Sequence, residues 1–270
     1  MLKTRYPIFL VHGVGFRDRR HLCYWGRIPK ILEEGGATIA YGGQDSWGET
    51  AHNAEILKKS LLEYISKTGC EKVNIIAHSK GGVEARYLAA ALGGAPHIAS
   101  ITTISSPHHG SKIMDTLLKF PNWMFCATAF FINLWFRLLG DKNPDFHAAC
   151  HQLTSTYMTD FNNKYPDVAG IYYQSYASAM KNSFSDIFMC LPHFFVNLTD
   201  GESDGLVSVS SAAWTNFKGV WRGTTSRGIS HADSVDMRRR RFTKKPSAGN
   251  VSDICSCYAE LVRELKLSGF

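Results

Sequence analysis

The sequence has no cysteine or histidine spacing of the kind that binds zinc or builds a disulfide framework. Its seven cysteines are an odd number, no two form a Cys-x-x-Cys pair, and no histidines alternate with them at zinc spacing. Charged residues are scarce as well, at 20% of the 270 residues against 44% hydrophobic ones. This composition excludes a disordered chain, a collagen-like repeat and a charge-rich coiled coil, and indicates a packed globular protein.

The sequence also lacks an uninterrupted apolar run long enough to cross a membrane. The segment 123–139 comes near, but it has 17 residues with Asn133 and Arg137 among them, whereas a spanning helix needs about 20. The strand-like run 7–11 begins too early to follow the charged and apolar parts of a signal peptide. We therefore expect no transmembrane span and no signal peptide in this chain, and the compartment stays open.

The positive charge is concentrated in one place. The formal net charge is +7, and six positive side chains lie within 238–245, so the remainder is close to neutral. This distribution does not favour a nucleic-acid partner. We interpret the basic run as a solvated loop that could attract anionic lipid headgroups.

No internal repeat, low-complexity tract or linker divides the chain, and its length fits one large core, so we predict a single domain over 1–270. Apolar strand patterns are expected at 7–12, 37–41, 72–77 and 98–105, with helices at 24–34, 51–67 and 81–92 between them. Continuously apolar strands separated by amphipathic helices predict an α/β fold, in which helices cover both faces of a mostly parallel sheet.

A serine stands where the third strand is expected to turn into a helix. Small residues lie two positions before and two after it, Ala77 and Gly81 around Ser79. A sharp turn between strand and helix lifts such a hydroxyl out of the sheet and places it at a helix amino terminus. The pattern predicts a nucleophile elbow with Ser79 as the nucleophile.

The loop after the first strand predicts an oxyanion hole for the same site. It contains Gly13, and enzymes with a nucleophile elbow place a second oxyanion donor in such a loop. The main-chain N–H groups of Val14 and Lys80 are therefore the expected donors.

The base and the acid of a catalytic triad should follow the serine in the order acid, then histidine. His231 is the only histidine after position 204, so this order requires it as the base. Asp204 is our choice for the acid because apolar sequence resumes directly after Gly205. Asp200, which follows the strand-like run 194–198, is the alternative.

Taken together, the chain resembles bacterial triacylglycerol lipases of the α/β-hydrolase fold, especially the Pseudomonas–Burkholderia–Proteus type. The resemblance covers nearly the whole chain. The segments that carry it are, in order, 7–13 (PIFLVHG), 24–26 (YWG), 72–79 (KVNIIAHS), 106–111 (SPHHGS), 203–207 (SDGLV), 230–233 (SHAD) and 265–269 (LKLSG).

The sequence departs from that family at two positions of the elbow. Ala77 stands where the family usually has glycine, and Lys80 where it commonly has glutamine. The backbone donor at 80 is unaffected, but we expect the Lys80 ammonium to be able to alter pH dependence or substrate preference.

The resemblance further implies a structural calcium ion and a lid. Asp233, two residues after His231, would be one calcium ligand, and Asp186 is loosely placed for a second. No cofactor is implied for the chemistry itself. The aromatic-rich region of about 113–147 corresponds to the lid of these lipases, and a buried helix pair within an enlarged core is the alternative.

The sequence therefore predicts a serine carboxylic-ester hydrolase, a lipase that cleaves acylglycerols at an oil–water interface. In this hypothesis Ser79, Asp204 and His231 form the triad, and contact with lipid surfaces is peripheral. The alternatives are a soluble short-chain esterase or acyltransferase with the same triad, and a catalytically silent protein that binds lipid surfaces.

Overall fold

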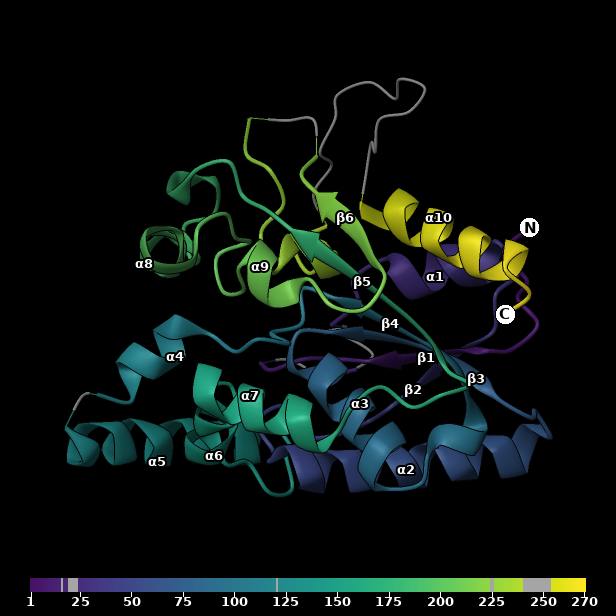
Figure 1. The fold of residues 1–270 in the computed structure, drawn as a ribbon, viewed down its shortest axis with the longest axis horizontal. Helices are drawn as coiled ribbons and strands as arrows, with labels where there is room; N and C mark the ends of the chain where they lie inside the picture. The colour runs from purple at the N-terminus through teal and green to yellow at the C-terminus, as the bar shows by residue number, and fades with distance from the viewer. Residues whose placement is uncertain (16, 19–23, 120, 224–225, 240–253) are drawn as a thin grey trace.

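The computed structural model describes residues 1–15, 17–18, 24–119, 121–223, 226–239 and 254–270 (Figure 1). Its centre is one six-stranded sheet with the order β2-β1-β3-β4-β5-β6, in which all neighbouring strands are parallel. The strands are β1 (Ile8–Val11), β2 (Ile39–Tyr41), β3 (Val73–His78), β4 (Ile98–Ile104), β5 (Tyr172–Ser178) and β6 (Phe217–Trp221). The predicted parallel α/β architecture is confirmed.

Helices cover both faces of this sheet (Figure 1). They are α1 (Ile28–Glu34), α2 (Thr50–Thr68), α3 (Lys80–Ala91), α4 (Lys112–Leu117), α5 (Asn122–Leu138), α6 (Phe146–His151), α7 (Ser155–Lys164), α8 (Cys190–Asp200), α9 (Val209–Ala212) and α10 (Ile254–Leu267), with 3₁₀ turns at Ala95–His97, Ser183–Ser185 and Asp233–Val235. α1 and α10 pack on one face, and α2 and α3 on the other.

The strands are continuously apolar because both of their faces are covered. Every residue of β1, β3 and β4 is buried. Trp25 and Tyr258 are fully buried in the core on the α10 side, while Leu57 and Leu88 are fully buried in the core on the α2 side. Burial of apolar area on two faces is the main stabilising term for a sheet of this kind.

The first predicted helix begins later than expected. Residues 24–27 form turns, and α1 starts at Ile28 with Pro29 in its first turn. Gly26 has a φ of 51°, and a Cβ atom there would lie 2.2 Å from the main-chain oxygen of Asp236. The close approach of another loop, rather than helix propensity, therefore determines the backbone at this point.

The run at 194–198 was expected to be a strand, and this is wrong, because it lies in helix α8. Within α8 the buried residues are His193 and Val196, which are three positions apart, and this is helical spacing. Phe194 and Phe195 between them are about half exposed, at 50% and 55%. Apolar residues on the exposed side made the run look strand-like, although the segment lies outside the sheet.

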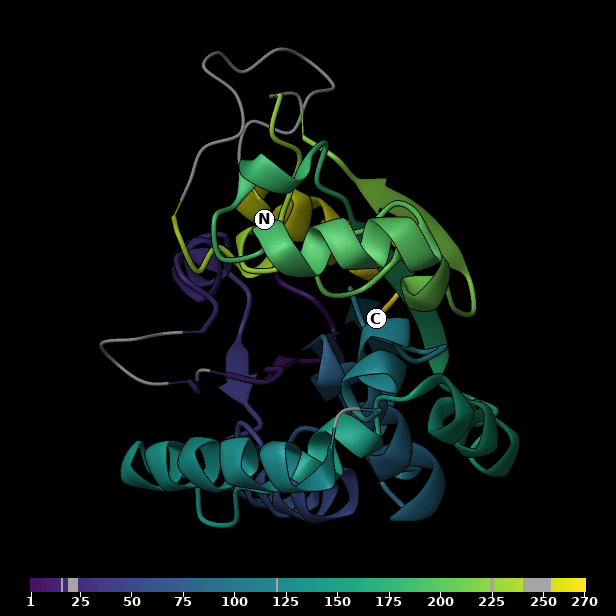
Figure 2. The ribbon, with the colours of Figure 1, turned by 90° about the vertical axis from the view of Figure 1, so that its left-hand side faces the viewer.

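Because all strands are parallel, their carboxyl ends share one edge of the sheet, and the loops after them meet there. Figure 2 views the molecule from this edge, with α8 crossing above and α5 lying below. The two chain termini lie at the other edge. The N–H of Arg5 donates to the carbonyl of Phe270 at 2.9 Å, and the Phe270 ring stacks on Tyr172 at the start of β5.

Two further expectations from the sequence concern a membrane-spanning helix and the basic run 238–245. Among the described residues, no helix combines the length and the apolar character that crossing a bilayer requires. Most of the basic run 238–245, from residue 240 onward, lies outside the described residues.

Candidate active site

Ser79 occupies a sharp turn between β3 and α3. Its φ and ψ are 55° and −133°, a strained combination for a residue with a side chain, and its N–H donates to the carbonyl of Ile104 at 3.0 Å. A Cβ atom at Gly81 would lie 2.4 Å from the His12 carbonyl oxygen, and one at Gly82 would lie 2.2 Å from the Ser106 hydroxyl. The two glycines are therefore required for α3 to begin this close to β1 and β4.

The loop after β1 approaches the same turn. A Cβ atom at Gly13 would lie 2.6 Å from the Cβ of Ser79, so only glycine permits this approach. Val14 follows Gly13 and lines the cavity that contains Ser79. Within the described part of the chain, neither Val14 nor Lys80 gives its main-chain N–H to a hydrogen bond. Both groups are thus available as donors beside Ser79.

The Lys80 side chain does not line this cavity, and an influence of its charge on the site stays a prediction. It is 1% exposed, its Nζ donates to the carbonyl of Gly48 at 2.8 Å, and it forms a close ion pair with the carboxylate of Glu84. The same carboxylate oxygen accepts a hydrogen bond from Asn53 at 2.7 Å. The ammonium charge is therefore neutralised within the protein, one helical turn from Ser79.

His231 and Asp204 are in direct contact. The Nδ1 atom of His231 lies 2.7 Å from Oδ2 of Asp204, and the N–H of His231 donates to the Asp204 carbonyl at 2.8 Å. The other carboxylate oxygen accepts N–H groups of Leu206 and Val207 at 3.1 and 2.9 Å. Four hydrogen bonds therefore fix the carboxylate and the imidazole relative to each other, with Asp204 fully buried.

Asp200, the alternative acid, lies elsewhere. It is the last residue of α8, and its carboxylate pairs with the ammonium of Lys112 at 2.8 Å. The structure brings Asp204, and not Asp200, to the imidazole of His231.

Ser79 and His231 line one cavity of about 300 Å³ at the carboxyl edge of the sheet. Most of its other walls are apolar side chains from several loops and helices, among them Trp47, Met114, Leu153, Met189, Leu206, Val207, Val235 and Met237. The Nε2 atom of His231 is buried and has no hydrogen-bond partner among the described residues. The cavity therefore joins a strained serine, an imidazole nitrogen without a partner and a largely apolar surface.

A layer of polar side chains behind His231 was not anticipated from the sequence. The ring of His78 lies 4.4 Å from that of His231, and its two nitrogens contact the hydroxyls of Tyr24 at 2.6 Å and Ser234 at 2.8 Å. The Ser234 hydroxyl also donates to the His231 carbonyl at 2.7 Å. Burial, and secondarily the charge of His231, hold the pKa of His78 well below its usual range, so this ring stays neutral.

The signal for this layer was only partly visible in the sequence. His78 directly precedes the nucleophile, but its partners Tyr24 and Ser234 are 54 and 156 positions away. Only the fold brings them together.

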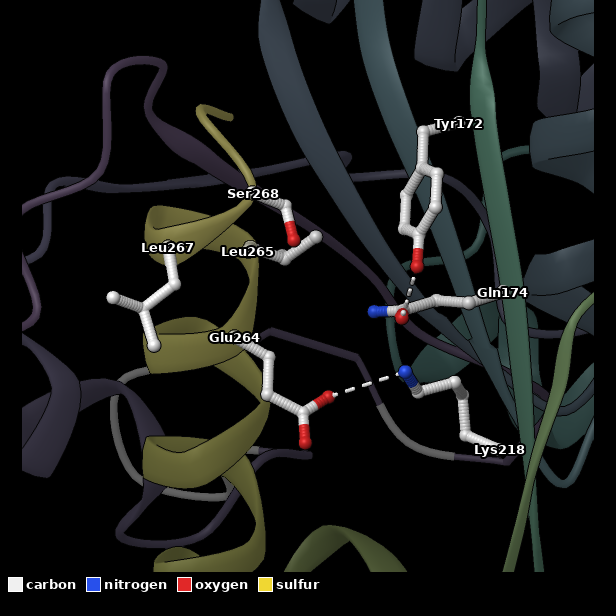
Figure 3. Close-up of a pocket in the computed structure, with 7 residues that line it drawn as sticks. All are labelled: Tyr172, Gln174, Lys218, Glu264, Leu265, Leu267 and Ser268. Atoms are coloured by element: carbon white, nitrogen blue, oxygen red, sulfur yellow. Dashed lines mark hydrogen bonds and ion pairs between the residues drawn. The ribbon is translucent and has the colours of Figure 1, made fainter.

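A second hollow, of about 180 Å³, lies at the opposite edge of the sheet between β5, β6 and α10 (Figure 3). Its side chains pair with one another, since Lys218 contacts Glu264 at 3.7 Å and the Tyr172 hydroxyl donates to Gln174 at 3.3 Å. No histidine lines it, so it offers no base for a serine nucleophile.

The arrangement of strands and loops is similar to that of solved lipases and esterases. The lipase of Staphylococcus hyicus has a TM-score of 0.72 at 16% identity, covering 98% of this chain and 96% of that one. A metagenomic carboxyl esterase has a TM-score of 0.70 at 17% identity, over 98% of this chain and 76% of the esterase. The chain has the α/β-hydrolase fold.

Sequence comparison gives named relatives. Triacylglycerol lipase 2 of Saccharomyces cerevisiae is 27% identical over 260 residues, which are 92% of this chain and 74% of the yeast protein. A triacylglycerol lipase of Burkholderia plantarii is 33% identical over 178 residues, 60% of this chain and 49% of that protein. The chain is similar in sequence to proteins named triacylglycerol lipase. The match spans about half the length of the bacterial relative, and no protein-family model matches the chain.

The region 113–147, predicted as a lid, forms α4, α5 and the start of α6. Among the described residues of this region, Met114 alone lines the Ser79 cavity. Phe125 and Ala129 are buried against Phe146 and Cys150, so one face of α5 belongs to a small core. The other face of α5 is exposed. Closure of this region over the cavity stays a prediction.

The described residues around His231 do not fit the calcium ion that the resemblance implies. Calcium takes six to eight oxygen ligands, whereas both carboxylate oxygens of Asp186 already accept hydrogen bonds from the protein. The guanidinium of Arg238 forms a close ion pair with the same carboxylate. Asp233 is buried at the start of the 3₁₀ turn after His231. Within the described ranges, no cluster of three or more acidic, histidine or cysteine side chains could hold a metal ion.

Proposed function

We propose that this protein is a serine carboxylic-ester hydrolase that cleaves acylglycerols. The proposal rests on one observation above all, which is that a serine in a strained elbow and a histidine supported by a buried aspartate line the same apolar cavity. Its kinship with triacylglycerol lipases supports the same chemistry.

In the proposed mechanism the Ser79 hydroxyl attacks the ester carbonyl carbon, and its proton passes to Nε2 of His231. The N–H groups of Val14 and Lys80 donate to the oxyanion that forms. The imidazolium then gives the proton to the departing alcohol, which leaves an acyl group on Ser79. A water molecule, deprotonated by His231, then attacks the acyl carbon of this acyl-enzyme. The bond between this carbon and the Ser79 oxygen breaks, His231 returns the proton to that oxygen, and the carboxylic acid is released.

The role of Asp204 in this mechanism is to hold His231 in the reactive tautomer. A carboxylate at 2.7 Å from Nδ1 favours a proton on that nitrogen, which leaves Nε2 free to accept the serine proton. The same carboxylate stabilises the imidazolium that follows. The N–H groups of Leu206 and Val207 keep the carboxylate from rotating away.

The substrate class is proposed from the surface around the cavity. α5 and the segment leading through α8 flank the carboxyl edge of the sheet (Figure 2). Both carry many exposed apolar side chains. On α5 they are Trp123, Met124, Phe130, Phe131, Leu134, Trp135 and Leu138. On the α8 segment they are Phe184, Ile187, Phe188, Leu191, Phe194, Phe195 and Leu198. Apolar surface of this extent is typical of a contact with a lipid phase or another partner.

Covalent labelling tests the proposed chemistry. An alkyl fluorophosphonate should be attacked by the Ser79 oxygen, with loss of fluoride, and the adduct mass should appear on the peptide that contains Ser79. Pretreatment should abolish hydrolysis of p-nitrophenyl butyrate. Ser106, which is also buried near the elbow, should remain unlabelled and serves as an internal control. A folded protein that is neither labelled nor active on this ester is a lipid-surface binding protein rather than an enzyme.

A comparison of substrates separates a lipase from a soluble esterase or acyltransferase. We expect the rate on tributyrin to rise abruptly above its solubility limit, because the emulsion surface removes the cost of keeping the α5 and α8 side chains in water. That cost is about 25 cal/mol per Å² of apolar area. Phe131→Asp and Trp135→Asp should reduce the rise and leave hydrolysis of a soluble acetate ester within about twofold, since neither side chain lines the cavity.

Leu267→Asp is the matched control, because Leu267 is 81% exposed but lies on α10 at the opposite edge of the sheet. It should leave the rise unchanged. A smooth saturation curve through the solubility limit in the wild-type protein would assign it to the soluble esterases.

A further inference from the structure

The buried carboxylate of Asp186 joins two loops beside the cavity. Its Oδ1 atom accepts the N–H groups of Phe188 and Met189 at 3.0 and 3.3 Å. Its Oδ2 atom accepts the hydroxyl of Ser230 at 2.8 Å and faces the guanidinium of Arg238. Asp186 is 1% exposed, so its charge has no access to water and depends on these partners.

Through Ser230, these contacts also reach the backbone next to His231. Ser230 directly precedes His231, and its oxygen also accepts the N–H of Asp233 at 3.2 Å. The loop 228–238 therefore carries His231 near its start and the cation Arg238 at its end. The Arg238 guanidinium also lies 5.2 Å from the centre of the Phe188 ring, which gives it a second contact on the Asp186 loop.

The Asp186 carboxylate is ionised in this environment. Burial alone would raise its pKa, but the hydrogen bonds from Ser230 and Arg238, together with the Arg238 charge, hold the pKa below its usual value. A buried anion that loses its cation is strongly destabilising to the loops it joins.

We propose that Arg238 is a built-in cation that positions the His231 loop, in the place where related lipases are expected to use calcium. This inference rests on the proposed function. The guanidinium neutralises Asp186, and Asp186 then holds Ser230 and with it the backbone on both sides of His231. Arg238 is a positioning residue, since it does not line the cavity and its partners among the described residues, Asp186 and Phe188, are not members of the triad.

If Arg238 takes the place of calcium, the stability and the activity of the protein should not depend on calcium. The unfolding midpoint and the ester hydrolysis rate of the wild-type protein should not change with 5 mM EDTA or with 5 mM added CaCl₂. Arg238→Gln should lower kcat for a soluble ester by about 10²-fold with KM within about threefold, because a base displaced by about 1 Å costs rate rather than binding. Arg238→Lys, which keeps the charge, should recover at least half of that loss on a logarithmic scale.

Two further arms separate positioning from mere folding. Added guanidinium chloride at 20 mM should restore part of the kcat of Arg238→Ala, whereas NaCl at equal ionic strength should not. Arg239→Gln is the matched control, because Arg239 is the exposed neighbour in the same loop, and it should behave as wild type. If Arg238→Gln does not fold, the response of the wild-type protein to EDTA and the kcat of Arg238→Lys decide whether Arg238 has this role.

The proposal is overturned if EDTA lowers the wild-type unfolding midpoint and CaCl₂ restores it, or if folded Arg238→Gln keeps wild-type kcat. A protein without any esterase activity would refute the proposed function. The unfolding midpoints measured with EDTA and with CaCl₂ would still decide whether Arg238 or calcium stabilises this loop.

Discussion

Ser79→Ala and His231→Ala are each expected to lower kcat for ester hydrolysis by about 10⁴ to 10⁶-fold. In the proposed mechanism Ser79 supplies the oxygen that forms the acyl-enzyme, and His231, which lines the same cavity, accepts the serine proton. Members of a triad act as a unit, so removing both should cost little more than removing one. Initial rates on p-nitrophenyl butyrate, with circular dichroism to verify the fold, measure this effect.

The two aspartates provide the internal comparison for this prediction. Asp204→Asn should lower kcat by about 10⁴-fold, because an amide at this position favours the wrong tautomer of His231. Asp200→Asn should leave kcat within about twofold, since its carboxylate pairs with Lys112 on the surface. A folded Ser79→Ala protein with more than a tenth of wild-type activity would refute the assignment.

Lys80→Gln should lower the free energy of unfolding by about 3–5 kcal/mol, because it leaves the Glu84 carboxylate buried without its cation. Lys80 and Glu84 are 1% and 2% exposed, so water cannot take over the role of the ammonium. The proposed oxyanion donor at position 80 is the backbone N–H, which the substitution keeps. In protein that is still folded, kcat should therefore stay within about tenfold of wild type, or about 1.4 kcal/mol of barrier. Urea unfolding and initial rates measure the two quantities separately.

Glu84→Gln tests the origin of the stability loss. The double variant Lys80→Gln, Glu84→Gln removes both charges and should be more stable than either single variant. Lys59→Gln is the surface control, because Lys59 forms the same i,i+4 pair with Glu63 in water and should cost less than about 1 kcal/mol. Loss of more than a hundredfold in kcat without loss of stability would place the Lys80 ammonium in the chemistry.

The first half of the sheet could be predicted closely from the sequence. The strand expected at 72–77 is shifted by one residue from β3, and the strand expected at 98–105 is one residue longer than β4. These strands are buried on both faces, so each is a continuous apolar run, and glycines mark the ends of the helices between them. Local sequence determines such elements, and local sequence was sufficient to find them.

The second half and the detail of the site could not be predicted in the same way. α8 exposes Phe194 and Phe195, so its apolar pattern follows a surface outside the core and its helical period is obscured. The contact of His231 with Asp204 follows from where loops of the fold meet. The pairing of Lys80 with Glu84 was visible as i,i+4 spacing, but its complete burial was not.

The meeting of the two chain ends at the amino edge of the sheet determines how this molecule can be handled. A purification tag, a fusion partner or a covalent link to a solid support at either end would face away from α5, α8 and the Ser79 cavity. Because the N–H of Arg5 and the carbonyl of Phe270 are 2.9 Å apart, a short linker could join the ends and allow new ones to be opened in a surface loop. A protein immobilised through its ends would keep the Ser79 cavity turned away from the support.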